Sequence, residues 1–120
     1  AQAPRRAPEP KPPESVPEPP PTAYDRDLFA LAEVIGSLAF LRQLCGTPDA
    51  AEWPKRMEAL LESEGGTQGR RARLAGAYNK GYRDFALTYR LCTDHAVAAA
   101  ERFLRRGEEL SRSIASRYGG

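Results

Sequence analysis

Apolar positions between residues 25 and 45 recur every three or four residues, which is the spacing of one face of an α-helix. Asp25 suits the first turn of such a helix, Gly46 is a natural residue just after its end, and Pro48 prevents simple continuation. The pattern therefore predicts a first helix over residues 25–45. Its apolar positions are Leu28, Leu31, Ile35, Leu38, Leu41 and Cys45.

A second, shorter helix is predicted from a run with the same period. Its apolar positions are Trp53, Met57, Leu60 and Leu61. Pro54 fits a first turn, where its missing N–H has no intrahelical partner, so the helix is expected to start near Trp53 and to end at Gly65 and Gly66. We expect Trp53 to cover one end of the helical domain rather than to bind a ligand.

Two longer helices follow. Thr67 is a good N-cap for the third, which is predicted to run to about Cys92. Thr93 and Asp94 offer caps for the fourth. The third helix has its stripe at Leu74, Tyr78, Gly81 or Tyr82, Phe85, Tyr89 and Cys92, and the fourth at Val97, Ala100, Leu104, Gly107, Leu110 and Ile114.

These segments predict an all-α fold, a small up-down bundle of about four helices. Strand-like alternation does not occur in the sequence, and short turns make consecutive helices antiparallel neighbours. Glycine inside a helix costs about 1 kcal/mol relative to alanine, so glycines at such positions are expected to make room for close helix contact or for an aromatic ring. They are Gly36, Gly81 and Gly107.

The first 22 residues have a different composition. They hold nine of the eleven prolines and a single large aliphatic residue, Val16. Such a segment cannot bury enough apolar surface to offset its ordering entropy. The sequence therefore predicts a disordered Pro-rich leader over residues 1–22, with polyproline II character, and a helical domain over residues 23–120.

Charge and chain start favour an exported protein that binds no nucleic acid. The net charge of +2 is too small for the basic face that nucleic-acid binding demands. The chain begins with Ala1, and we expect a mature periplasmic protein whose signal peptide has been cleaved. The longest apolar stretch, residues 28–41, contains Glu33 and is too short and too polar to span a bilayer.

The two cysteines, Cys45 and Cys92, are predicted at the ends of the first and third helices. In an up-down bundle these helices point the same way, so both cysteines reach one end of the domain and can form a disulfide. Free buried thiols are one alternative. Catalysis or metal binding is another, although helix C-termini do not activate thiols and the single histidine, His95, lacks an obvious orienting partner.

The predicted third helix carries an aromatic stripe flanked by polar and basic residues. Tyrosine and arginine dominate binding hot spots, so one hypothesis is that this face binds a partner. The alternative is core packing, with tyrosine hydroxyls at the rim and arginine stems covering the rings. The candidate partner-binding residues are Tyr78, Asn79, Tyr82, Arg83, Tyr89 and Arg90.

Three arginines near the start of the predicted third helix form a candidate anion site. Cations are unfavourable at a helix N-terminus, just as Glu62 and Glu64 are unfavourable at the C-terminus of the preceding helix. The alternative is therefore that the two sets offset each other across the turn. The arginines are Arg70, Arg71 and Arg73.

Motifs for catalysis do not occur in the sequence: it has no Gly-rich phosphate loop, nucleophile elbow or paired carboxylates. We therefore expect no catalytic residue, cofactor or metal, and favour a non-enzymatic binding or regulatory module of the bacterial cell envelope. One alternative is a small all-α periplasmic enzyme, a mutase or a peptidoglycan-acting hydrolase, which needs a polar cavity. Another is a holdase-like chaperone, which needs an exposed apolar groove.

Four features together resemble a known family: the run LAFLRQLCG, Trp53 downstream, the run AYNKGYRDFALTYRLCT and the closing ASRYGG. The family is an uncharacterised group of small exported alphaproteobacterial proteins, a domain of unknown function, and the resemblance covers residues 24–119. Pro54 departs from its pattern. The resemblance implies an envelope location and a helical domain with paired cysteines, and it supplies no activity. The expected partner is an envelope protein or a peptidoglycan-associated factor.

Overall fold

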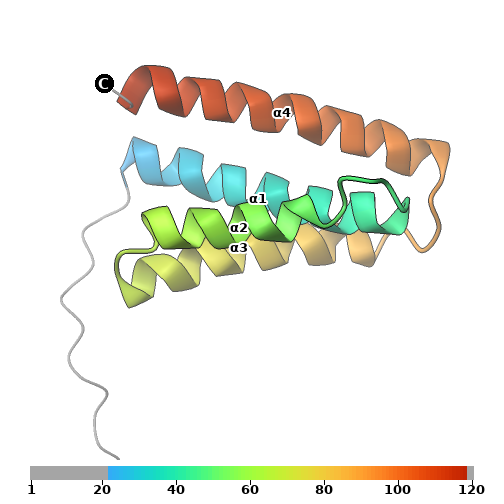
Figure 1. Cartoon of the computed structure of the whole chain (residues 1–120), viewed down its shortest axis with the longest axis horizontal. Helices are drawn as coiled ribbons and strands as arrows, with labels where there is room; N and C mark the ends of the chain where they lie inside the picture. The colour runs from blue at the N-terminus through green and yellow to red at the C-terminus, as the bar shows by residue number, and fades with distance from the viewer. Residues whose placement is uncertain (1–21, 119–120) are drawn as a thin grey trace, which may run out of the picture.

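The computed structural model describes residues 22–118, which form four α-helices and no strand (Figure 1). Consecutive helices run in opposite directions, so the predicted all-α, up-down domain is confirmed. Within these residues, no helix is both long enough and apolar enough to cross a membrane. Apart from Thr22, the predicted leader lies outside the described residues. The helices are α1 (Ala23–Leu44), α2 (Glu52–Glu64), α3 (Gln68–Ala86) and α4 (Asp94–Tyr118).

Both ends of α1 are closed by local motifs. At the N-terminus, the Asp25 amide donates a hydrogen bond to the Thr22 hydroxyl oxygen (3.2 Å), and the Thr22 amide donates one to the Asp25 carboxylate (3.2 Å). At the C-terminus, Gly46 adopts a φ of 61° and its amide donates to the carbonyl oxygen of Gln43 (3.1 Å). The predicted glycine stop is confirmed, whereas the Thr22 cap was not foreseen.

Helix α3 ends at Ala86, so the prediction that it reaches Cys92 is wrong. The amide of Tyr89 donates to the carbonyl oxygen of Phe85 (2.8 Å), which closes the last turn. A straight continuation would carry Cys92 about 9 Å further along the helix axis, whereas the chain bends back toward the end of α1. Tyr89 and Arg90 therefore lie in the loop before α4 rather than on a helix.

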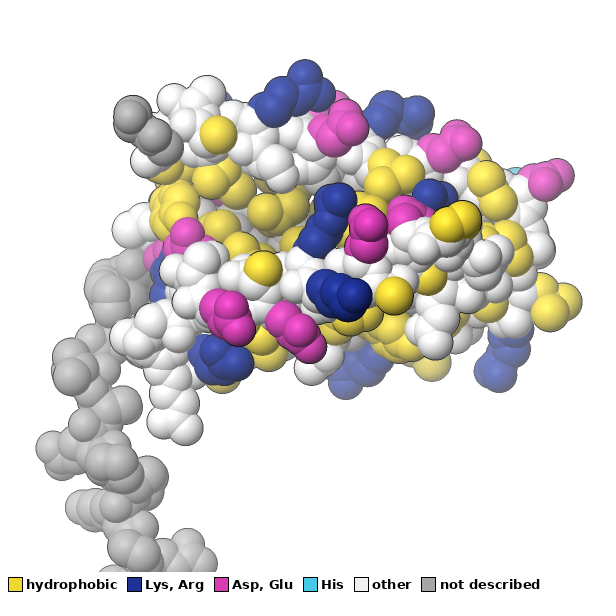
Figure 2. Space-filling model, in the orientation of Figure 1, with side chains coloured by type: hydrophobic (Ala, Val, Ile, Leu, Met, Phe, Trp, Pro, Cys, Tyr) yellow, Lys and Arg dark blue, Asp and Glu magenta, His cyan; other side chains and the backbone are white. Residues whose placement is uncertain are grey.

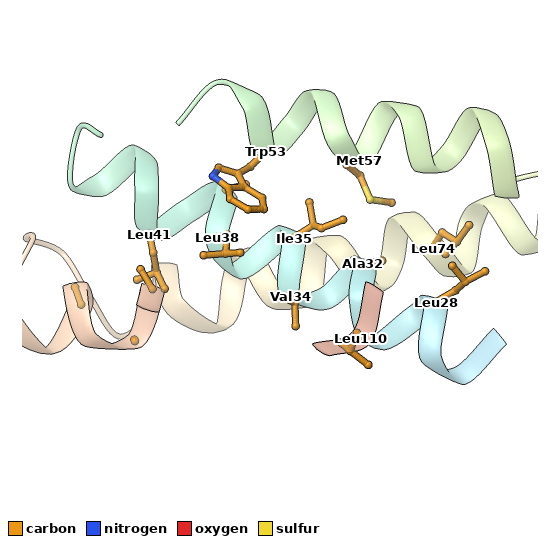
Figure 3. Packing of buried hydrophobic residues seen from close by; sticks show 14 residues of the cluster. Leu28, Ala32, Val34, Ile35, Leu38, Leu41, Trp53, Met57, Leu74 and Leu110 are labelled. Atoms are coloured by element: carbon orange, nitrogen blue, oxygen red, sulfur yellow. The ribbon is translucent and has the colours of Figure 1, made fainter. Parts of the chain in front are cut away.

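Helix α1 lies in the middle of the domain and packs against α2, α3 and α4. It is apolar on most of its surface, as expected for a helix with neighbours on several sides. The α3 and α4 helices also meet at one aromatic pair, Phe85 and Phe103, whose ring centroids lie 5.1 Å apart. Figure 3 shows the core. Its buried hydrophobic residues are Leu28, Ala32, Val34, Ile35, Leu38, Ala39, Leu41, Trp53, Met57, Leu74, Ala96, Ala99, Ala100 and Leu110.

The crossing of α1 and α3 depends on two glycines. A Cβ atom added at Gly36 would overlap the carbonyl oxygen of Tyr78 and lie 2.8 Å from its carbonyl carbon. One added at Gly81 would overlap the carbonyl oxygen of Glu33 and lie 2.9 Å from Oγ of Ser37. The buried Ser37 hydroxyl donates to the carbonyl oxygen of Gly81 (3.3 Å). The close helix contact expected at Gly36 and Gly81 is confirmed.

Small residues bring the start of α4 against α1. Ala96, Ala99 and Ala100 are buried, whereas Val97 is 42% exposed. The prediction that Val97 faces the core is wrong, because the alanine face permits a closer approach between the helix axes than a branched side chain does. Leu110, further along the predicted stripe, is buried as expected.

Cys45 and Cys92 lie at the same end of the domain, with their sulfur atoms at bonding distance and their Cα atoms 4.9 Å apart. The predicted disulfide is confirmed. It joins the residue after α1 to the loop that enters α4, and so ties α4 to the central helix by a covalent bond.

Candidate functional site

A groove of about 690 Å³ lies between α2 and α4, with α1 as its floor. Its volume falls in the range of small-molecule sites. Within residues 22–118, α2 and α4 each pack on α1 but not on each other, so the groove is open to solvent. Figure 2 shows hydrophobic side chains in the hollow between α4 at the top and α2 below it. The floor consists of Leu31, Val34, Ile35 and Leu38.

The walls of the groove carry both apolar and polar residues, the polar ones including Ser63 of α2 and Ser111 of α4. Trp53 and Leu60 of α2 contribute to one wall, and Leu104 and Gly107 of α4 to the other. A Cβ atom added at Gly107 would meet only Val34, at an ordinary contact distance of 3.4 Å. This glycine therefore differs from those of the α1–α3 crossing: it does not permit a close helix contact, and it leaves space in the groove.

Trp53 is held in its wall by a polar cluster. The indole N–H donates to the Asp49 carboxylate (3.2 Å), and Arg56 lies over the ring, 4.5 Å from its centroid. Asp49 also accepts hydrogen bonds from the Thr47 hydroxyl (2.6 Å) and from Nε of Arg42 (3.0 Å). These hydrogen bonds, that from Thr47 above all, lower the pKa of Asp49 to about 2. Trp53 thus lines the groove while its ring is buried in the core, 6% exposed, and the expectation that it covers one end of the domain stays a prediction.

We expect the Asp49 cluster to lose its stabilising effect in acid. The folded-state pKa of about 2 lies below the ordinary value of 3.8, so the contribution is complete above about pH 4 and is lost as the pH falls through 2. Because Asp49 is partly exposed, the contribution is about 1–2 kcal/mol. Asp49→Asn should therefore be destabilised by that amount at about pH 6 and differ little from the natural protein at about pH 2. Urea unfolding at both pH values measures this, and an equal difference at both would contradict it.

Each wall of the groove also carries an arginine. The guanidinium of Arg56 lies 3.8 Å from Glu52, and that of Arg112 lies 3.7 Å from Glu108, in each case one turn away on the same helix. The two arginine side chains are 59% and 77% exposed. Exposed pairs of this kind contribute little to stability, so both guanidinium groups can turn toward another anion. The groove therefore combines an apolar floor with one exposed arginine on each wall, each paired with a glutamate.

The residues of the predicted partner-binding face do not line the groove. Tyr78 and Tyr82 are half-buried against the core, and the Tyr82 hydroxyl donates to the side-chain oxygen of Gln43 (3.2 Å). Tyr89 stacks on Phe85, with ring centroids 6.0 Å apart. The rings thus pack inward, as the core alternative expects, while partner binding by this face stays a prediction. The exposed members of the set are Asn79, Arg83 and Arg90.

Of the three arginines in the candidate anion site, Arg70 is already paired inside the domain. Its guanidinium forms ion pairs with Asp25 and Glu64, and its Nε donates to the backbone carbonyl of Glu64 (2.6 Å). The hydrogen bond from Arg70 lowers the pKa of Asp25. Arg71 donates a hydrogen bond to the backbone carbonyl oxygen of Leu61 in the last turn of α2 (3.5 Å), and Arg73 is exposed. Arg70 therefore serves to offset acidic groups, and the structure lends no support to an anion site there.

The comparisons with known proteins place the chain in a family. A family described as a protein of unknown function (DUF2385) matches residues 23–118, which include all four helices. The chain belongs to this family. The DUF2385 match agrees with the resemblance in the sequence to a domain of unknown function. No curated protein and no solved structure matches the chain.

Proposed function

We propose that this DUF2385 protein is a non-enzymatic binding module of the bacterial cell envelope, located in the periplasm, and that it holds its ligand in the groove between α2 and α4. The observation that carries the proposal is the hollow of about 690 Å³ that lies over an apolar α1 floor, between two helices that do not pack on each other. Concave apolar surfaces with a few polar groups at the rim are typical of binding sites.

The groove has a rigid floor and two walls that can shift. Its floor, α1, is locked to α3 at the Gly36 and Gly81 crossing on the other side of the helix. Its walls, α2 and α4, do not pack on each other, so the width of the groove changes when either helix shifts on α1. This construction favours binding with limited adjustment of the walls.

Binding accounts for the charged groups of the groove better than catalysis does. The two carboxylates that line it, Asp49 and Glu108, are paired with Arg42 and Arg112. The low pKa of Asp49 makes it a poor general acid or base near neutral pH. The groups at the rim are therefore better suited to orient a ligand than to move a proton.

The disulfide supports the periplasmic location. Disulfides persist in oxidising compartments, of which the bacterial periplasm is one, and are rare in the reducing cytoplasm. Cys92 is exposed, so reductants would have access to the bond between Cys45 and Cys92. A protein whose fold relies on this bond is therefore better suited to the periplasm than to the cytoplasm.

A holdase-like chaperone is a second candidate, favoured by a separate observation. Leu87 and Leu91, in the loop beside the disulfide, are 79% and 74% exposed. Together with the groove, they give the domain two apolar surfaces that face solvent. A holdase would bind many unfolded chains without selectivity, whereas a binding module would select one class of ligand.

Gly107 offers a direct test of the groove. Gly107→Leu should fill the groove, because a Cβ at this position meets only Val34 and the rest of the side chain must extend into the open space. Thermal unfolding is measured in the presence of three ligand classes: single-chain lipids, peptidoglycan fragments and amphipathic peptides. We expect at least one class to raise the melting temperature of the natural protein and to have no such effect on Gly107→Leu.

The matched control is Gly107→Ala. It replaces glycine by a better helix former, so it should be more stable than the natural protein by up to about 1 kcal/mol and should keep the ligand response. A response of equal size in both variants would place the ligand outside the groove. If no ligand class acts selectively and the natural protein suppresses aggregation of unrelated unfolded proteins, the holdase alternative is correct.

A further inference from the structure

We propose that the ligand of the groove is a medium-chain fatty acid, with its alkyl chain on the α1 floor and its carboxylate bound by Arg56 and Arg112. The inference rests on the proposed binding function and adds the chemical class of the ligand. Three properties of the groove carry it: its narrow opening, its apolar floor, and the arginine on each wall.

The groove is too narrow for a helix and suits a slender chain. Its floor residues Val34, Ile35 and Leu38 are only 6%, 6% and 1% exposed, so side chains of α2 and α4 leave little of the floor open. An α-helix with its side chains is about 10–12 Å across and would have to push the walls apart. A single alkyl chain is more slender, so the side chains of α2 and α4 need to part much less for it to lie along the floor.

The length of the groove also fits an alkyl chain. On α2 the lining runs from Trp53 to Ser63, which corresponds to about 15 Å along the helix. Over that length the floor offers Leu31, Ile35 and Leu38 in succession, while the hydroxyl groups of Ser63 and Ser111 belong to the walls. The floor therefore offers contacts to methylene groups, and the polar groups of the groove lie on its walls.

The rim supplies the counter-charge for one anionic head. Guanidinium groups bind carboxylates with two parallel hydrogen bonds, and Arg56 and Arg112 lie on opposite walls. Each pairs with a glutamate of its own helix, and Arg56 also lies over the Trp53 ring, where it can keep its stacking while its N–H groups turn to a ligand. Glu108 also lines the groove, so its pairing with Arg112 must loosen as the ligand carboxylate enters. Asp49 stays neutralised by Arg42 and does not compete.

Trp53 gives this proposal a direct readout, because it is the single tryptophan of the chain and it lines the groove. Dodecanoate brominated at C2, next to its carboxylate, should quench Trp53 fluorescence in a saturable titration of the disulfide-bonded protein, because Arg56, which binds the carboxylate, lies over the Trp53 ring. Gly107→Leu should abolish the quenching, and Gly107→Ala should retain it. Arg56→Gln and Arg112→Gln should each weaken dodecanoate binding about tenfold, the loss of one charge-assisted contact.

The neutral analogue dodecanol separates recognition of the head from burial of the chain. It should bind more weakly than dodecanoate to the natural protein and should be unaffected by either arginine substitution. Equal binding of dodecanol and dodecanoate would overturn the role of the arginines. Quenching that survives in Gly107→Leu would place the alkyl chain outside the groove. If dodecanoate does not bind but another ligand class stabilises the natural protein and not Gly107→Leu, the fatty-acid proposal is wrong and the groove function stands.

Discussion

Replacing Gly81 by alanine is expected to lower the free energy of unfolding by about 3 kcal/mol or more. The new Cβ would overlap the carbonyl oxygen of Glu33 and lie 2.9 Å from Oγ of Ser37. Backbone on both sides is held in a helix, so the overlap can be relieved only by moving α3 away from α1. That movement would also break the hydrogen bond from Ser37 to the Gly81 carbonyl oxygen. Urea unfolding followed by circular dichroism measures the loss.

The same helix provides the control. Gly76 lies on α3 with no atom within 4 Å of an added Cβ, so Gly76→Ala should be stabilised by up to about 1 kcal/mol through helix propensity alone. The two substitutions are chemically identical and differ only in what the methyl group meets. A Gly81→Ala protein as stable as Gly76→Ala would show that the helices do not cross as closely as the structure indicates.

The parts of the fold that could be predicted from the sequence are those determined by residues close together in the chain. Thr67 caps α3 by accepting a hydrogen bond from the Arg70 amide (3.1 Å), and Gly46 ends α1 in the left-handed conformation. Both are decided by residues within one turn of the helix end. The end of α3 is different, because its apolar period continues to Cys92 although the helix stops at Ala86. The path of the chain after Ala86 depends on the position of the end of α1, where Cys45 pairs with Cys92. The apolar period within α3 contains no information about that distant position.

The groove could not have been predicted from the periodicity of any one helix. Leu31, Ile35 and Leu38 would be buried equally well in a bundle closed by contact between α2 and α4. Whether those two helices touch depends on where around α1 each of them packs. Because α1 is apolar on most of its surface, its sequence does not specify those positions. The one local sign was Gly107, a missing side chain in the middle of an otherwise apolar stripe. Its position in the sequence predicts room for close helix contact or for an aromatic ring, whereas in the structure it lines the groove.

Removing the disulfide by replacing both Cys45 and Cys92 with alanine is expected to cost about 4 kcal/mol. The bond joins residues 47 positions apart, and the loss of a cross-link over a loop of that length raises the entropy of the unfolded chain by this amount in the chain-entropy model. The domain has few other means of holding α4, whose packing is mainly on α1 and, through Phe103, on Phe85. Urea unfolding should show a lower midpoint and a steeper denaturant dependence, because the unfolded chain exposes more surface without the cross-link.

Reduction of the natural protein is the matched control for the double substitution. With a reductant present, the natural protein should unfold at nearly the same urea concentration as the Cys45→Ala, Cys92→Ala protein, since both lack the cross-link and keep the same helices. The double substitution should also weaken ligand binding in the groove, because α4 forms one of its walls and is then held by packing alone. If the double substitution costs less than about 1 kcal/mol, the alanine face of α4 suffices to hold it on α1 and the cross-link is not what fixes that wall.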